Sequence, residues 1–277
     1  MKRDRPILFS APMVRALLDG RKTQTRRVTD QPPPECSINY MLGNESWLPA
    51  EQRSPIRRTF EAWGGDLYRN KPEKALCGAF DIVPRYQIGD RLWVRESGVQ
   101  LGNAVDEGRE RDGYEVCGFR YAADEATIYL PGMFEGHDYE RRRNSIHMPR
   151  WASRLTLTVT DVRVQRLQEI SAADAIAEGV IRQDPTAEDE GWNRQRAEDE
   201  GIDASPMSPV WLAPGTRQGF GPRADDPQWG PTPEFAFRLL WDSLNAARGF
   251  GWDVNPWVVA VTFDPKHGNI DQIAGGA

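Results

Sequence analysis

The chain has 277 residues, 39% of them hydrophobic and 27% charged, which is the composition of a globular protein with enough apolar side chains for a core. Its net charge is −6 and its isoelectric point is near 5.3. Domains that bind long stretches of nucleic-acid backbone usually have an isoelectric point above about 9, so a small ligand or a local basic patch fits this chain better.

The sequence favours a cytoplasmic protein without a membrane partner. No stretch approaches the roughly 18 apolar residues of a membrane span. The basic and then apolar N-terminus is similar to a signal peptide, but Pro12, Arg15 and Asp19 interrupt it. The cysteines are few, far apart and in no CxxC pair, which favours a reducing compartment and no disulfide framework. They are Cys36, Cys77 and Cys117.

The first 80 residues begin with regular elements and then lose periodicity. Residues 5–9 predict a short strand, and Ser10 is a suitable N-cap for a helix that ends at Gly20. Residues 21–28 follow as an extended basic segment. Residues 31–80 show no steady period and are predicted to form an irregular insertion.

A turn at Gly89 is predicted to lead into a strand over residues 91–95. Leu92 and Val94 lie on one face of this strand. Because side chains alternate along a strand, Trp93 is expected to point to the opposite face.

The clearest strand covers residues 154–167, where apolar residues alternate with threonines until the phase shifts near Asp161. Such a shift indicates a β-bulge. Ser171 followed by Asp174 is a capping-box pattern and predicts a short helix that ends at Gly179.

The C-terminal third starts with residues 183–233, which are rich in Pro, Gly and acidic residues and are predicted to form an insertion or lid. Thr232 then begins a helix that ends at Gly249, followed by a strand over residues 257–263. The tail after Lys266 is expected to fray. The apolar face of the helix has the spacing i, i+3, i+4, i+7 and consists of Phe237, Leu240, Trp241 and Leu244.

Strands interrupted by short helices, without strict βαβ alternation, indicate an α+β fold. We expect a single domain over residues 1–277, built on a small bent sheet or β-barrel with flanking helices and two long insertions. The expected core covers about 5–30, 82–182 and 234–264, and the insertions about 31–80 and 183–233.

Several familiar chemistries are missing from the sequence, which has no GxxxxGK[ST], GxSxG or HExxH motif. Its histidines (His137, His147 and His267) have no metal-ligand spacing. We therefore expect no metal and no cofactor. Any hydrolysis would have to use Lys, Thr, Ser, Asp or Glu.

Lys22 and Thr25 are candidates for such chemistry, because a turn after the helix stop can bring residues i and i+3 within about 7 Å. A threonine hydroxyl needs a nearby base to act as a nucleophile, and a desolvated lysine beside other cations can serve. Arg21, Arg26 and Arg27 would supply the cations. The alternative is a solvated basic edge strand.

Glu178 lies in the last turn of the predicted short helix, where the helix dipole disfavours a carboxylate by about 0.3–1 kcal/mol. It is either an exposed residue or one held there for proton transfer. Among the ten tryptophans, Trp241 is expected in the core, whereas Trp93 is the better candidate for stacking on a base.

Four blocks in order resemble the ASCH domain, a PUA-like family, and are similar to the larger ASCH proteins of phages and prophages. The blocks are LLDGRKTQTRRV (17–28), IGDRLWVRES (88–97), LTLTVTDVRVQRLQEISAADAIAEGV (155–180), and FRLLWDSLN with NPWVVAVTF (237–245, 255–263). They cover under half of the chain. The resemblance implies a PUA-like bent barrel.

Small members of this family are amidohydrolases of N4-acetylcytidine that work with a Lys, a Thr and a Glu. The family segment G-R-K-T-x-T-x-R matches here, and the resemblance implies that Lys22, Thr25 and Glu178 are catalytic. It further implies a modified cytosine nucleoside or base as the substrate. Arg27, Trp93 and Glu96 are the expected substrate contacts. This chain is more than twice the size of those enzymes, and its insertions have no counterpart there.

Two assignments of roles stay open. Thr25 would be the nucleophile and Lys22 its base, with Glu178 orienting Lys22; or Glu178 would be the base and Lys22 would stabilise the oxyanion. Two other functions also stay open, because other PUA-like proteins bind RNA or cleave it. The chain would then be an RNA or modified-base binding module or a ribonuclease, or an accessory protein that makes protein contacts.

Overall fold

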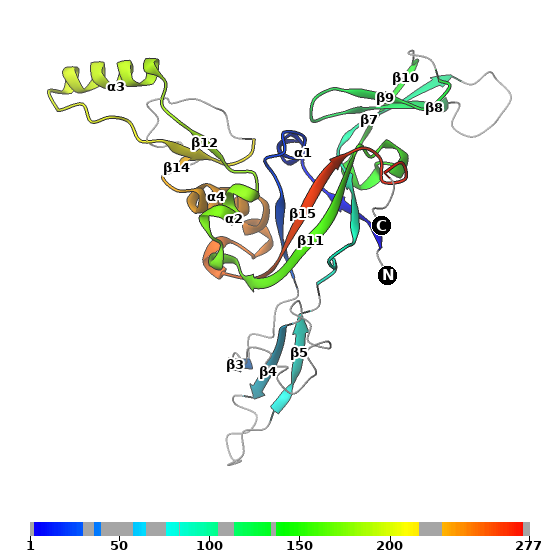
Figure 1. Ribbon diagram of the computed structural model, residues 1–277, viewed down its shortest axis with the longest axis horizontal. Coiled ribbons are helices and arrows are strands. Elements are labelled where there is room, and N and C mark those ends of the chain that lie inside the picture. Colours follow the sequence, from blue (N-terminus) through cyan, green and yellow to red (C-terminus); the bar gives the residue numbers. More distant parts are fainter. Residues whose placement is uncertain are drawn as a thin grey trace.

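The computed structural model describes residues 3–29, 36–39, 58–64, 76–82, 84–104, 114–133, 137–215 and 229–273. Its centre is a five-stranded sheet in the order β1-β6-β11-β15-β2 (Figure 1). Only the β1–β6 pair is parallel. The strands are β1 (Asp4–Leu8), β2 (Gln24–Val28), β6 (Arg91–Arg95), β11 (Leu155–Arg166) and β15 (Trp257–His267).

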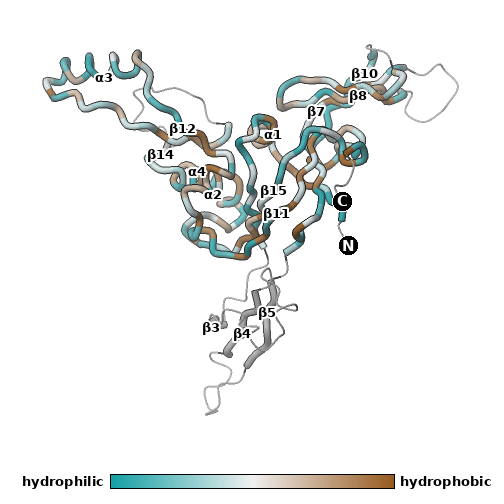
Figure 2. The backbone as a smooth tube through the Cα atoms, viewed as in Figure 1, coloured by the Kyte–Doolittle hydropathy of each residue, from teal (hydrophilic) through white to brown (hydrophobic). Residues whose placement is uncertain are grey.

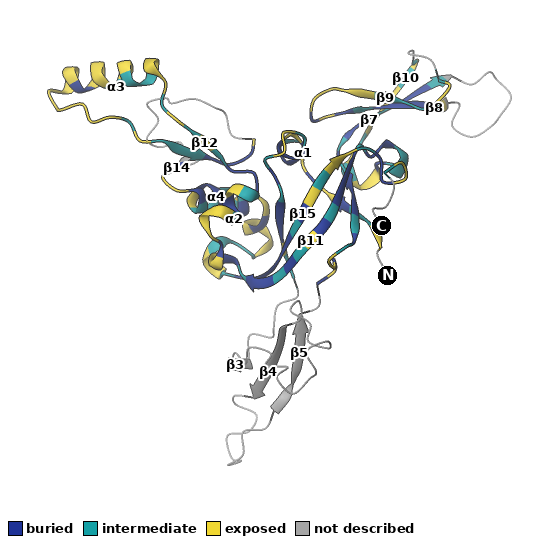
Figure 3. Ribbon diagram, in the orientation of Figure 1, coloured by how far each residue is buried: buried dark blue, intermediate teal, exposed yellow. Residues whose placement is uncertain are grey.

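The two long strands, β11 and β15, organise the core. Their register shifts between Val159 and Asp161, which confirms the predicted bulge. Apolar side chains of β6, β11 and β15 form one cluster with Val14 and Leu17 of helix α1 (Ala11–Leu18). Figure 3 shows the buried residues concentrated along these strands.

The central sheet is curved but not closed into a barrel. β1 and β2 are its two edges, and the described strands form no backbone ladder between them. One side-chain contact spans the gap instead, because Arg27 Nη2 of β2 donates to the carbonyl oxygen of Leu8 in β1 at 2.6 Å. The α+β class is confirmed, whereas the closed barrel expected from the sequence is not what the described strands form.

Helices α2 (Ala172–Ala177) and α4 (Pro233–Asn245) pack together beside the sheet. Both N-caps are as predicted: Ser171 Oγ accepts from the Asp174 N–H, and Thr232 Oγ1 accepts from the Phe235 N–H. The short 3-10 helices are Ser145–His147, Arg150–Ala152, Leu167–Glu169, Ala246–Arg248 and Trp252–Val254. No described helix is long and apolar enough to cross a bilayer.

Two further antiparallel sheets lie outside the centre. The first consists of β7 (Gly98–Ala104), β8 (Tyr114–Tyr121), β9 (Thr127–Tyr129) and β10 (Tyr139–Arg143). The second consists of β3 (Cys36–Asn39), β4 (Arg58–Gly64) and β5 (Leu76–Ile82). The strands of the second sheet correct the irregular structure expected at 31–80 for the residues that the structure describes there.

The predicted insertion at 183–233 also contains regular structure. β12 (Ile181–Gln183), β13 (Val210–Leu212) and β14 (Trp229–Gly230) form a small sheet, and helix α3 (Ala187–Glu200) projects from the body (Figure 1). The surface of α3 is largely hydrophilic (Figure 2). Leu212 and Ala213 are buried, so this part of the segment belongs to the folded body.

Residues 268–273, which follow β15, pack against the body and do not fray as expected. Asn269 is buried, and its Nδ2 donates to the carbonyl oxygens of Arg150, Trp151 and Ser153. Ile270 is also buried. A polar anchor of this kind has no apolar pattern, which explains why the sequence does not indicate it.

Replacing Asn269 with alanine would remove a donor from three carbonyl oxygens, of which, within the described part of the chain, only that of Arg150 keeps another, the Ser153 N–H. We expect Asn269→Ala to lower the free energy of unfolding by about 1–3 kcal/mol, the usual cost of such a loss. Urea titration followed by circular dichroism would measure it. The exposed neighbour Gln272 is the matched control. Equal stabilities of Asn269→Ala and Gln272→Ala would show that the tail does not anchor the fold.

Candidate active site

Lys22 is carried into the interior by the turn that ends α1. Gly20 adopts the left-handed region at φ 71°, and the N–H groups of Arg21 and Lys22 both bond to the carbonyl of Ala16. The next residue, Thr23, donates its N–H to the carbonyl of Ala177 at 2.8 Å. The turn therefore joins the end of α1 to the end of α2, and Lys22 is only 1% exposed.

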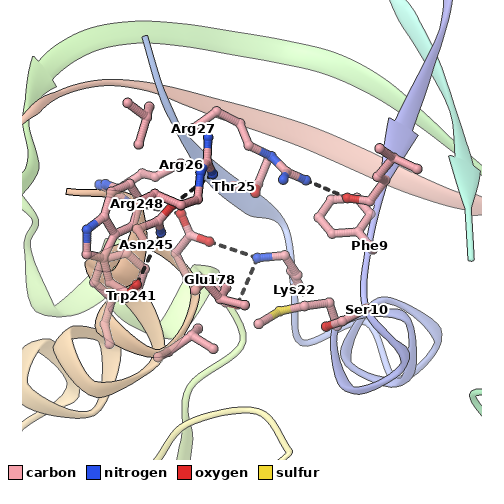
Figure 4. A pocket seen from close by; sticks show the side chains of 16 residues that line it. Phe9, Ser10, Lys22, Thr25, Arg26, Arg27, Glu178, Trp241, Asn245 and Arg248 are labelled. Atoms are coloured by element: carbon pink, nitrogen blue, oxygen red, sulfur yellow. Dashed lines mark hydrogen bonds and ion pairs between the residues drawn. The ribbon is translucent and has the colours of Figure 1, made fainter. Parts of the chain in front are cut away.

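Glu178 caps the C-terminus of α2 and is 3% exposed. The following residue, Gly179, has φ 100°, and a Cβ atom there would lie 3.2 Å from the Cβ of Ala16. A glycine is therefore needed for α2 to end so close to α1. Lys22 Nζ donates to Glu178 Oε2 at 2.8 Å and to the Glu178 carbonyl oxygen at 2.9 Å (Figure 4).

A second ion pair extends this contact. Arg26 Nη1 donates to Glu178 Oε1 at 3.2 Å, and Arg26 Nη2 donates to Asp174 Oδ2 at 2.8 Å. Gln24 Nε2 donates to the other oxygen of Asp174 at 3.1 Å. The cations of Lys22 and Arg26, just before β2 and within it, thus alternate with the carboxylates of Glu178 and Asp174, at the end of α2 and within it.

Burial dominates the electrostatics of Lys22. It lowers the pKa of the Lys22 ammonium, and the nearby charges of Arg27 and Arg26 act in the same direction, while Glu178 partly opposes them. A lysine with a depressed pKa has more of the neutral amine near physiological pH. Buried ionic groups often cost more in desolvation than they return, so such a network is a reason to look for function.

A cavity of about 420 Å³ lies against this network, within the range of small-molecule sites. Lys22, Thr25, Arg27 and Glu178 all line it. Thr25 is 4% exposed, and its hydroxyl has no hydrogen-bond partner in the part of the chain that the structure describes. A free hydroxyl therefore shares a cavity with a buried lysine.

Aromatic and polar side chains complete the wall. The ring of Phe9 lies 5.7 Å from Lys22 Nζ and 5.2 Å from the Arg27 guanidinium. Trp241, Asn245 and Arg248 enter from α4 and the turn after it (Figure 4). Sequence reasoning missed Phe9, Asn245 and Arg248 and placed Trp241 in the core alone. For Asn245 and Arg248, the only indication in the sequence was their position as polar residues at the end of an apolar helix.

Two expected substrate contacts, Trp93 and Glu96, do not line this cavity. Trp93 faces away from the Leu92 cluster as predicted, but it is buried, and the Arg95 guanidinium lies 5.1 Å from its ring. Glu96 is buried with both carboxylate oxygens held by Arg154, at 2.9 and 3.0 Å. In the structure these contacts hold both side chains outside the cavity that contains Lys22.

The chain gives no match to any protein-family model, curated protein or solved structure. The function therefore has to be inferred from the chemistry of the cavity. Within the described ranges, no three His, Cys, Asp or Glu side chains come close enough to hold a metal ion.

The depressed pKa of Lys22 has a consequence for stability. Between the folded-state pKa of Lys22 and the ordinary value of 10.5, the unfolded chain binds more protons than the folded chain. The free energy of unfolding therefore rises with pH in that window, by at most about 1.4 kcal/mol per pH unit. Lys22→Met should lack this rise, which denaturant titrations from about pH 8 to pH 10.5 would measure.

Lys266 is exposed, so Lys266→Met is the control and should follow the pH dependence of the wild type. If Lys22→Met also follows the wild type throughout, the pKa of Lys22 is not depressed.

Proposed function

We propose that the chain is an amidohydrolase of the ASCH type that removes the acyl group from the exocyclic amine of N4-acylated cytosine or cytidine. One observation carries the proposal: the buried Lys22, held by Glu178, lines the same cavity as the unbonded hydroxyl of Thr25. A nucleophile, a base and a group that orients the base are the parts needed for acyl transfer.

In the proposed reaction, Thr25 Oγ1 attacks the carbonyl carbon of the N4-acyl amide. The neutral amine of Lys22 takes the hydroxyl proton and passes it to the cytosine nitrogen as the carbon–nitrogen bond breaks. Water then hydrolyses the acyl ester of Thr25. The products are a carboxylic acid and the unmodified cytosine amine.

The contacts of Glu178 fit an orienting role better than that of a base. One carboxylate oxygen accepts from Lys22 and the other from Arg26. The Glu178 carbonyl accepts from Lys22 as well, so Nζ is fixed by two acceptors from one residue. In the alternative, Glu178 activates the nucleophile and a charged Lys22 stabilises the oxyanion.

The cavity wall has groups suited to a cytosine ring. Phe9 and Trp241 offer aromatic surface for packing against the base. Arg27 and Arg248 offer N–H donors for the acceptors O2 and N3 of cytosine. A modified-base binding module or a ribonuclease would use similar contacts, and it is the Lys22–Glu178 pair beside Thr25 that favours hydrolysis over binding alone.

The roles can be separated with conservative substitutions. Thr25→Ala and Lys22→Arg should each lower the kcat for N4-acetylcytidine by about 10³-fold or more, because residues that act as a unit lose nearly all activity together. A guanidinium does not release its proton near neutral pH, so arginine cannot replace Lys22 as the base. Thr25→Ser keeps a hydroxyl and should retain measurable turnover. Chromatographic detection of released cytidine would measure each rate.

Thr127→Ala is the matched control, since Thr127 is exposed on β9. If Lys22→Arg turns over normally, the base is another group, and Glu178 is the first candidate. If Thr25→Ala turns over normally, no acyl ester forms and water attacks the amide directly. Normal rates in both variants would remove the proposed function.

The pH dependence distinguishes the two assignments of Lys22. If the neutral amine is the base, kcat/KM should rise with pH to a plateau, with an apparent pKa below 10.5. If the charged ammonium stabilises the oxyanion, kcat/KM should instead fall through that pKa. Initial rates of N4-acetylcytidine hydrolysis from pH 6 to pH 10 would decide, with the protein's circular dichroism checked at each pH.

A further inference from the structure

A second cleft continues from the candidate active site along the gap between β1 and β2. It encloses about 630 Å³ and shares Leu8, Arg27, Val28 and Arg248 with the cavity that contains Lys22. The shared residues lie at the junction. At this junction Arg27 Nη2 donates to the carbonyl oxygen of Leu8 across the gap, so a ligand that extends from Thr25 into the cleft has to pass beside this contact or displace it.

The cleft is strongly basic. Among the described residues, four arginines line it and no aspartate or glutamate does. Among the described residues, no carboxylate lies within ion-pair distance of any of these four. They are Arg27, Arg85, Arg95 and Arg248. The chain as a whole has a net charge of −6, so a group of arginines without acidic partners among the described residues is unusual for it.

Several arginines outside the cleft have acidic partners. Arg91 and Arg150 both pair with Asp4, and Arg154 pairs with Glu96 and Asp124. Among the described residues the cleft arginines have no such partner and make carbonyl, amide or aromatic contacts, as do Arg15, Arg143 and Arg166 elsewhere. The cleft differs in that four such side chains line one space, which leaves their charge available to an anion.

The cleft arginines are also held in position. The Arg85 guanidinium lies 5.8 Å from the centre of the Tyr86 ring, and Arg27 lies over Phe9. Arg95 lies over Trp93 and donates from Nη2 to the carbonyl of Ile146, while its Nε is buried and has no acceptor in the described part of the chain. Guanidinium groups fixed on aromatic rings lose little freedom when they bind a planar or tetrahedral oxyanion.

We propose that this cleft binds a phosphate group on the ribose, so that the substrate is an N4-acylated cytidine mononucleotide. The inference rests on the proposed function for the acyl end of the ligand. The acylated base lies in the cavity with Thr25, and the ribose lies at the residues shared by the two spaces. The phosphate lies among the arginines.

The distribution of charge favours a mononucleotide over an RNA chain. Basic residues for phosphate binding gather in one cleft, while the isoelectric point of the whole chain is near 5.3. A polynucleotide needs a basic track that follows several phosphates. A phosphate monoester has up to two negative charges at one point, which matches a compact group of cations.

The first test compares N4-acetylcytidine with its 5′- and 3′-monophosphates as substrates of the full chain. One of the monophosphates should have a kcat/KM at least about tenfold higher, as expected for charge-assisted contacts to phosphate. This preference should shrink as NaCl is raised, because salt screens exposed charges. Equal kcat/KM values for nucleoside and nucleotides would overturn the proposal.

The second test changes the cleft itself. Arg85 lines the cleft but not the cavity that contains Thr25, so Arg85→Gln should lower the nucleotide-to-nucleoside ratio of kcat/KM by several-fold. Arg141→Gln removes the same charge from an exposed position on β10 and is the matched control, with an unchanged ratio. If the control lowers the ratio as much, the preference reflects net charge and not this cleft.

A third measurement does not depend on catalysis. Calorimetry with cytidine 5′- and 3′-monophosphate and with cytidine should show tighter binding of one monophosphate, and Arg85→Gln should abolish the difference. This outcome without any hydrolysis would support the phosphate site and defeat the amidohydrolase. Hydrolysis of N4-acetylcytidine without a preference for a phosphate would support the amidohydrolase and overturn the phosphate site. A preference for cytidine-containing oligonucleotides over both monophosphates would overturn the proposal in favour of RNA.

Discussion

The pairing of Lys22 with Glu178 is the constraint on which this part of the molecule depends. Two charged groups are taken out of water, and each makes the burial of the other tolerable. Arg26 and Asp174 repeat the arrangement one step further along β2 and α2. The edge strand β2 is thereby held against α2 by ionic contacts as well as by apolar packing. Removing Glu178 would leave Lys22 without its carboxylate in the interior, whereas Glu178 would keep Arg26 if Lys22 were removed.

The open edges of the central sheet leave space beside this network. A sheet closed into a barrel would pair β1 with β2 through their backbones, and the space between them would be lost. Here the two edges are linked by the Arg27 side chain, and both the cavity and the basic cleft lie in the gap. The curvature of the sheet brings β1 and β2 toward each other. Because no backbone ladder joins these two strands among the described residues, the gap between them leaves room for a ligand.

Features set by near neighbours in the sequence could be predicted. The β11 bulge and the caps at Ser171 and Thr232 are examples, because the side chains that define them lie within a few residues of each other. Strand alternation correctly gave the face of Trp93 but could not show that Arg95 covers it. Glu96 meets Arg154 across 58 residues, and Asn269 meets Arg150 across 119, and no local pattern records such contacts. Lys22 and Glu178, 156 residues apart, were linked only through a family resemblance.

The position of β2 in the sheet also determines when the site can form. In the described sheet β2 pairs only with β15, and Gln24 and Thr262 bond across 238 residues of chain. Closing so long a loop is slow, and a ribosome must make nearly all of these residues before the contact is possible. Until then Thr25 has no strand to align it. The same strand β15 also completes the main core cluster, so the proposed site and the core would be completed together, late in folding.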